Sequence, residues 1–297
     1  MIDALAAAGT LTWVAIVVKA LVYATSLTAA GSILATVALR SLPQGDRAWV
    51  IRLALVCTVA ATMLSLARLP LRASFLMGGT WDGAFNPMIL TMVGQSPLGT
   101  SIAIRLAGLA LVPAILIPKP IGPVLAATGA LMVAASFTFR GHALAEPRVI
   151  LGLLLAVHLL TIAFWIGAFA PLYRLAGQNG VGAGTVAHEF GKLALWGVGA
   201  LAVSGSLALW LLTKDLIAAL GTAYGQIFVL KLSAFTVLLG LAALNKLRLT
   251  PALLRQDKGA AQSLRRSVLA EIALVALILL ATATLTTVSA PLMVESS

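Results

Sequence analysis

The sequence predicts an all-α, polytopic membrane protein: a bundle of about eight transmembrane helices with a re-entrant segment or half-helix on its outer side. Composition is the first reason, because 61% of the 297 residues are hydrophobic and only 10% are charged, against about a quarter in a soluble domain. The second reason is that apolar runs of ~20 residues, long enough to cross a bilayer, recur along the chain. We therefore treat residues 1–297 as a single transmembrane domain in a lipid bilayer.

The apolar runs place the spans at roughly 11–39, 49–68, 100–118, 121–139, 148–172, 190–213, 225–247 and 267–288. The third and fourth spans are separated only by the Pro-Lys-Pro of residues 118–120. Proline cannot continue a helix, so a tight helical hairpin is expected there. The sixth span contains Gly197, Gly199 and Gly205, which we assign to helix packing, because small residues let helices approach closely in lipid.

The basic residues predict the orientation of the bundle. A net charge of +11 would suggest nucleic acid as a partner for a soluble protein. In a membrane protein, Lys and Arg instead collect in cytoplasmic loops, so no nucleic-acid partner is expected. The link between the seventh and eighth spans has the strongest such signal, with Lys246, Arg248, Arg255, Lys258, Arg265 and Arg266 against a single acid, Asp257. Alternation from this loop predicts that both termini face outward.

With this orientation, the longest connection, residues 69–99, lies on the outer side. It is interrupted at Gly78-Gly79, Pro87 and Pro97, yet it is too apolar for a plain loop. We interpret it as a half-helix or re-entrant cover over the outer opening, since irregular backbone at that depth needs protein or a water cavity around it. Its methionines, Met77, Met88 and Met92, supply thioethers, which are soft metal ligands.

Two of the three histidines lie near this outer side. His142 occupies a short polar break between two apolar runs, and His158 lies inside the second run. Trp165 is seven residues further on and therefore on roughly the same helical face. A ligating group within a span is a functional-site candidate by default. A surface histidine at 142 and a core hydrogen bond at 158 are the alternatives.

Imidazole and thioether together suit copper, and Cu(I) in particular. Magnesium or calcium would need a carboxylate cluster, and the chain has only nine acidic residues, none of which we place in the middle of a span. Methionine in an apolar helix is often only a gap filler. With that alternative open, the sequence predicts an outer-side copper site formed by His142, His158, Met77, Met88 and Met92.

The remaining polar residues in or near the spans have weaker interpretations. His188 and Glu189, at the inner end of the sixth span, form either a solvated cap or an exit-side metal site. Lys19 and Lys231 lie inside the first and seventh spans, where they either reach outward to water or pair with a carbonyl. A cation repels a cationic cargo, so we assign both lysines structural or gating roles. Asp82 is a candidate partner for a metal or for Lys231.

Several segments carry a resemblance to a known family: GHA at 141–143, HLLTIAFWIGA at 158–168, FGKLALWGVGALAVSG at 190–205, YGQIFVLKLSAFTVLLGLAALNKLRLTPAL at 224–253 and LRRSVLAE at 264–271. With these segments the sequence resembles the copper-resistance protein D (CopD) family of bacterial inner-membrane proteins. The CopD-like core is best matched over residues 137–290. The N-terminal half is similar to the family only in the number and spacing of its helices.

The resemblance implies copper movement across the bacterial inner membrane, and the leading hypothesis is import, with the ion received from the periplasm. It also implies a small periplasmic partner, a copper-binding protein of the CopC type. The orientation predicted from the basic loops then places both termini in the periplasm. His142 and His158 fall on matching motif positions, so the resemblance implies that they are copper ligands. No GxxxxGK[ST] phosphate loop is present in the sequence, so transport would be passive or ion-coupled.

Two alternatives remain open at this stage. One is an enzyme, a b-type haem membrane reductase resembling cytochrome b561, with haem held between histidines of neighbouring helices. Two haems would need four axial ligands, whereas this chain has three histidines, so a single haem between His142 and His158 is the form that fits. The other is a non-conducting docking subunit for a periplasmic copper protein. The leading hypothesis is a permease and not an enzyme.

Overall fold

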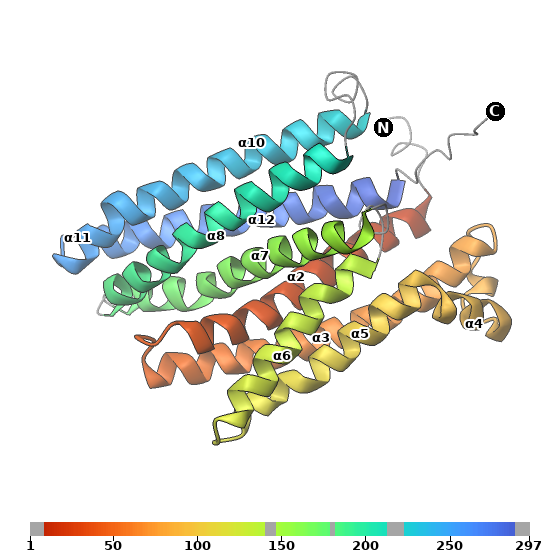
Figure 1. The fold of residues 1–297 in the computed structure, drawn as a ribbon, viewed down its shortest axis with the longest axis horizontal. Helices are drawn as coiled ribbons and strands as arrows, with labels where there is room; N and C mark the ends of the chain where they lie inside the picture. Colours follow the sequence, from red (N-terminus) through yellow and green to blue (C-terminus); the bar gives the residue numbers. More distant parts are fainter. Residues whose placement is uncertain (1–8, 140–146, 179–181, 213–222, 289–297) are drawn as a thin grey trace.

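The computed structural model is a bundle of long helices lying side by side (Figure 1). It describes residues 9–139, 147–178, 182–212 and 223–288. Eight helices in these ranges are long and apolar enough to cross a membrane, which confirms the predicted number. The long helices are α2 (Thr10–Ala38), α3 (Gln44–Leu76), α5 (Pro97–Leu111), α6 (Ile121–Ala135), α7 (Arg148–Gly177), α8 (Ala183–Leu212), α10 (Ala223–Leu244) and α12 (Ala260–Val288).

Shorter elements complete or connect the spans. The 3₁₀-helical η2 (Val112–Leu116) extends α5 as far as the Pro-Lys-Pro turn before α6, so the predicted hairpin is confirmed. A second 3₁₀ turn, η3 (Ser136–Phe139), follows α6 directly. After α10, a π-helical turn, η5 (Asn245–Leu249), and the short α11 (Thr250–Leu254) lead toward α12.

Helix α2 is the centre of the bundle and packs against α3, α6, α7 and α12. Its contact with α7 brings the two backbones together at Gly31 and Gly167. A Cβ atom added to Gly31 would lie 1.8 Å from the carbonyl oxygen of Ala163, so only glycine fits. This is the close approach that small residues permit where lipid provides no hydrophobic drive to association.

The glycines of the sixth span behave differently from the prediction. A Cβ atom on Gly199 or Gly205 would meet nothing within 4 Å, so their assignment to packing within this chain is wrong. Only Gly197 faces a neighbour, the Thr161 side chain, at 2.9 Å. Helix α8 contacts α7 along one side, and its other faces are largely exposed, whereas α2 is enclosed by neighbours.

The outer segment begins later than predicted. Helix α3 continues through Pro70 to Leu76, and two glycines with positive φ, Gly78 at 78° and Gly79 at 85°, follow its end. A 3₁₀ turn, η1 (Trp81–Gly83), leads to the nine-residue α4 (Pro87–Gln95), so the predicted half-helix is confirmed. Helix α4 packs against α3 and α5 at the edge of the bundle (Figure 1).

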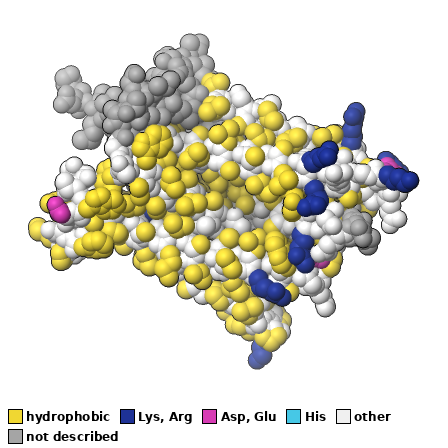
Figure 2. Space-filling view, turned by 180° about the vertical axis from the view of Figure 1, so that it is seen from behind, with side chains coloured by type: hydrophobic (Ala, Val, Ile, Leu, Met, Phe, Trp, Pro, Cys, Tyr) yellow, Lys and Arg dark blue, Asp and Glu magenta, His cyan; other side chains and the backbone are white. Residues whose placement is uncertain are grey.

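The basic side chains gather at one end of the molecule (Figure 2). The connection between α10 and α12 lies at this end and exposes Lys246, Arg248, Arg255 and Lys258. Helix α2 begins, and α12 ends, at the opposite end (Figure 1). This separation of charge matches the pattern from which the orientation was predicted.

Candidate functional site

The structure describes four of the five residues predicted to form the outer copper site. His158 is half-buried on α7, ten residues past Arg148 and about 15 Å along the helix axis. His142 lies outside the described residues. Met77 follows the last residue of α3 and Met88 and Met92 lie on α4, with exposed fractions of 45%, 74% and 55%. These thioethers therefore lie at the surface, at the end of the bundle that the sequence predicts to be the outer one.

The described residues contain no group of three or more His, Cys, Asp or Glu side chains placed to hold a metal ion. A copper site within this part of the chain would therefore use thioether sulfurs, or fewer than three His, Cys, Asp or Glu side chains. Soft Cu(I) accepts such a ligand set. Conduction also favours few ligands, because an ion held too firmly cannot leave.

Helix α8 begins at Ala183, so His188 and Glu189 lie in its second turn and not at its start. The Glu189 carboxylate accepts hydrogen bonds from the backbone N–H groups of Arg40 and Ser41, both at 2.9 Å, and from the Ser41 hydroxyl. These contacts tie α8 to the turn after α2. His188 and Asp82 are exposed. Lys231 lies on α10, and its side chain is outside the described set.

Trp165 belongs to a buried polar network that the sequence did not indicate. The Trp165 indole, 4% exposed on α7, donates its Nε1–H to Oε2 of Glu271 at 3.0 Å. Asn245, the first residue of η5, donates from Nδ2 to the other carboxylate oxygen at 2.5 Å. Phe190 on α8 packs against Trp165 edge-to-face, with ring centroids 6.1 Å apart. The network therefore connects α7, η5 and α12 beside α8.

Glu271 corrects the prediction that no acidic residue lies in the middle of a span. Helix α12 begins at Ala260, seven residues before the predicted start, so Glu271 is about 16 Å along the helix and only 3% exposed. Asn245 opens a π-helical turn, a local widening of the helix that is frequent at functional sites. The Thr250 hydroxyl closes this turn by donating to the Asn245 carbonyl at 2.8 Å.

Arg105 on α5 is a second buried ionisable residue that the sequence did not indicate, and it is completely buried. It donates from Nε to the Ser136 hydroxyl at 3.1 Å and from Nη2 to the Ser101 hydroxyl at 3.2 Å. Its guanidinium carbon also lies 4.1 Å from the ring centroid of Phe137. These contacts fasten α5 to η3, the turn that precedes residues 140–146.

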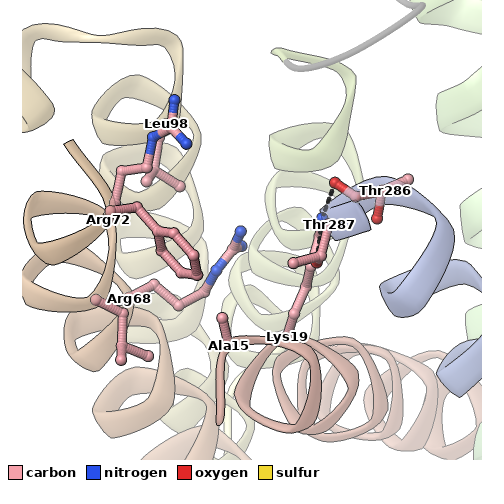
Figure 3. A pocket seen from close by; sticks show the side chains of 9 residues that line it. Ala15, Lys19, Arg68, Arg72, Leu98, Thr286 and Thr287 are labelled. Atoms are coloured by element: carbon pink, nitrogen blue, oxygen red, sulfur yellow. Dashed lines mark hydrogen bonds between the residues drawn. The ribbon is translucent and has the colours of Figure 1, made fainter. Parts of the chain in front are cut away.

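Lys19 pairs with a carbonyl, one of the two arrangements expected for it. The side chain is 6% exposed, and Nζ donates to the Thr286 carbonyl at 2.8 Å and to the Thr287 hydroxyl at 3.4 Å. It lies at the edge of a cavity of about 120 Å³ between α2, α3, α5 and α12, together with Arg68 and Arg72 (Figure 3). The sequence does not show that these three basic residues lie around one cavity, because they come from separate spans.

Comparison with known proteins adds independent information. The family profile described as "Copper resistance protein D" matches residues 184–285, and that described as "Copper resistance protein D-like, N-terminal domain" matches residues 8–149. The chain is also 27% identical over 207 residues to the copper transport protein CutJ of Bacillus subtilis (strain 168). That match covers 63% of this chain but only 38% of the relative, so the chain spans well under half of that protein's length. No solved structure matches the chain significantly.

Proposed function

The chain belongs to the copper resistance protein D family, and from this premise we propose that it imports copper across the bacterial inner membrane. Membership of this family and similarity to a copper transport protein support a copper-related membrane transport role, and they favour a transporter over an enzyme. The finer assignment of direction and ligands is our proposal. Its main support is His158, a half-buried imidazole inside a span, within a segment that carries the family resemblance.

In this proposal, copper arrives at the outer end, where Met77, Met88 and Met92 are exposed. A periplasmic copper-binding protein of the CopC type delivers it, and the thioethers accept the soft ion. His142 and His158 then hold it before it passes inward. Few and mixed ligands suit a conducting site, because each must release the ion as readily as it binds it.

Substitution of His158 tests the proposed site. Only neutral imidazole ligates copper, and glutamine preserves polarity and hydrogen bonding without that ligand. We expect His158→Gln to abolish bound copper and copper flux into proteoliposomes while the purified protein remains folded. His158→Leu should do the same. If His158→Gln retains normal copper content and flux, His158 is not a ligand and the proposed site is wrong.

The methionines are tested separately. Replacing Met77, Met88 and Met92 together with leucine keeps volume and apolarity and removes sulfur. Copper flux should fall while the amount of folded protein is unchanged. Met132→Leu on α6 is the matched control, since Met132 is half-buried in a different hairpin. Equal flux in the triple variant and the control would assign the three methionines to packing.

The direction of import requires the basic end to face the cytoplasm. A single cysteine at Lys258, which is exposed in the connection before α12, reports on this orientation in a Cys57→Ser background. An impermeant thiol reagent added to spheroplasts should label Lys258→Cys only after the membrane is opened. Labelling of intact spheroplasts would reverse the orientation and the proposed direction of transport.

A further inference from the structure

The Glu271 carboxylate is enclosed by neutral groups. It is 3% exposed, and its two hydrogen bonds come from uncharged donors, the Trp165 indole and the Asn245 amide. No Lys, Arg or His side chain of the described residues bonds to it. An ionised carboxylate removed from water is costly unless a cation or enough hydrogen bonds replace its hydration, and uptake of a proton removes that cost.

The titratable groups on the two long spans packed against α12, α2 and α7, lie at other levels of the bundle or bond to other groups. Lys19 on α2 bonds to Thr286, which is fifteen residues and about 22 Å past the carboxylate along α12. On α7, His158 lies seven residues, about 10 Å, before Trp165, and Arg148 lies at the start of the helix. The others are Tyr23, which packs on Phe137, Tyr173, which accepts from Arg265, and Arg174, which pairs with Asp46.

The charged groups closest to the carboxylate in sequence lie toward the basic end of the bundle. Helix α11 has no titratable residue, and on α10 the side chains of Tyr224 and Lys231 are outside the described set. Asn245 is half-buried, so the network extends from the buried carboxylate toward the exposed basic end. The charged groups of η5 and of the first turns of α12 are Lys246, bonded to the Gly191 carbonyl, Arg248 and Arg266, which are exposed, and Arg265, bonded to Tyr173.

The amide of Asn245 can pair with the Glu271 carboxyl group in either protonation state. An ionised carboxylate only accepts hydrogen bonds, and Nδ2 donates to it. A protonated carboxyl group donates an O–H, which Oδ1 can accept once the amide has turned over. Oδ1 is buried without a hydrogen-bond partner among the described residues, so the turn breaks no other bond of that oxygen. Trp165 donates to the other carboxyl oxygen in both states.

We propose that Glu271 binds and releases one proton during copper transport and that the Asn245 amide turns with each change of state. The proton forms an O–H bond with Oε1, the oxygen bonded to Asn245, and it leaves toward water at the basic end. Ionisable groups inside spans carry protons in many transporters, and π-helical turns such as η5 are frequent at functional sites. Coupling to copper rests on the proposed function, whereas the proton site itself does not.

Infrared difference spectroscopy of the full-length protein in detergent tests proton binding without copper. The C=O stretch of a protonated carboxyl group is separate from the bands of a carboxylate, and we expect such a band to appear as the pH is lowered. It should be lost in Glu271→Gln and retained in Asp257→Asn, the matched control, whose side chain is 46% exposed. A wild-type spectrum that matches that of Glu271→Gln at every pH would overturn the proposal.

Asn245→Ala is the second variant, because it keeps the acid and removes the partner. The carboxyl band should move to higher wavenumber, since its O–H then has no acceptor in the network. An unchanged band would exclude Asn245 from the proton site.

Copper flux into proteoliposomes tests the coupling. Initial rates are compared with and without an imposed pH gradient at one external pH. We expect the gradient to change the rate of the wild type and of Asp257→Asn and to leave that of Glu271→Gln unchanged, because an amide cannot exchange the proton. All three proteins retain His158, so titration of this imidazole cannot produce the difference.

The two proposals fail in different ways. An equal gradient response in Glu271→Gln and the wild type would show that Glu271 does not couple transport. Absence of copper flux in the wild type would instead refute copper transport, and the infrared band would still decide the proton site.

Discussion

Glu271 and Lys19 are ionisable residues with nearly the same burial, 3% and 6% exposed, in very different surroundings. Glu271 accepts hydrogen bonds from Trp165 and Asn245, so its carboxylate joins three elements in a closed network. Lys19 donates to the end of α12 and lies at an open cavity with Arg68 and Arg72. The comparison shows that burial alone does not separate a residue enclosed in a network of side chains from one that lies at the edge of a cavity.

The energetic consequences of the two arrangements differ. An ionisable group removed from water is strongly destabilising unless hydrogen bonds or counter-charges compensate for lost hydration. Around Glu271 the compensation comes from side chains of α7 and η5, so removing the carboxylate leaves buried donors without an acceptor. Around Lys19 the described compensation comes from a carbonyl and a hydroxyl at the end of α12, beside a cavity. Substitutions at the two residues should therefore affect stability unequally.

The largest effect is expected for Glu271→Ala. It leaves the buried Trp165 Nε1 and the half-buried Asn245 Nδ2 without their acceptor, at about 1–3 kcal/mol for the buried donor and less for the other, and it also opens a cavity. Thermal unfolding in detergent should show a strongly lowered midpoint or little folded protein. Glu189→Ala is the matched control, because the N–H groups of Arg40 and Ser41 can turn to water. Equal losses in the two variants would mean that the Glu271 network is not a buried clamp.

A smaller loss is expected for Trp165→Phe. Phenylalanine retains an aromatic ring next to Phe190 but has no N–H for Glu271, which keeps its bond to Asn245. Stability should fall by about 1–3 kcal/mol, the cost of one buried oxygen losing its donor. The unfolding midpoint should therefore lie between those of the wild type and Glu271→Ala. No change in the midpoint would show that the indole contributes ring packing and not its hydrogen bond.

The lengths of the apolar runs were sufficient to predict the number and order of the spans, because a bilayer imposes one length on every helix. The apolar runs did not show where polar residues extend a helix beyond its apolar part. Helix α12 begins at Ala260, and its first turns include Arg265 and Arg266, so the composition of these turns resembled that of a loop. That misplaced start made Glu271 look interfacial. Gly259, with φ of 80° directly before the helix, is the sequence signal that could have marked the true beginning.

Pro70 had a similar effect on the outer side. The span predicted from the apolar run ended at residue 68, just before Pro70, yet α3 continues through this proline, as membrane helices often do when neighbouring groups satisfy the freed carbonyl. Arg72 therefore lies on the same helix as Arg68 and not in the predicted outer segment. Lys19, Arg68 and Arg72 line one cavity although they come from different helices. Such contacts depend on how the helices rotate and pack against each other, and the sequence of one span does not show this. The ligand set for copper stays a prediction for the same reason.

Lys19→Met should have a smaller effect than either substitution above. The variant loses the bonds to Thr286 and Thr287, but it also removes the cost of keeping an ammonium group buried. These contributions oppose each other, so stability should stay within about 1 kcal/mol of the wild type. Thermal unfolding in detergent tests this expectation. A loss as large as that of Glu271→Ala would assign Lys19 to helix fastening, like Glu271.

The smallest effect is expected for Glu271→Gln, which separates the charge of this residue from its hydrogen bonds. The substituted amide oxygen can still accept from Trp165, but the amide nitrogen would face Asn245 Nδ2, donor against donor. Asn245 can resolve this conflict by turning its amide over, because its Oδ1 is buried without a hydrogen-bond partner among the described residues. The turned amide would accept from the new side-chain nitrogen at position 271, and both ends of the network would again be paired.

We therefore expect Glu271→Gln to unfold within about 0.5 kcal/mol of the wild type, since paired neutral groups can replace a buried charge at almost no loss. The matched variant is Asn245→Ala, which removes the acceptor that the turned amide would provide. Combined with Glu271→Gln, it should destabilise by more than the sum of the two single substitutions. An additive double variant would exclude the amide turn. A large loss in Glu271→Gln alone would show that the negative charge itself stabilises the bundle.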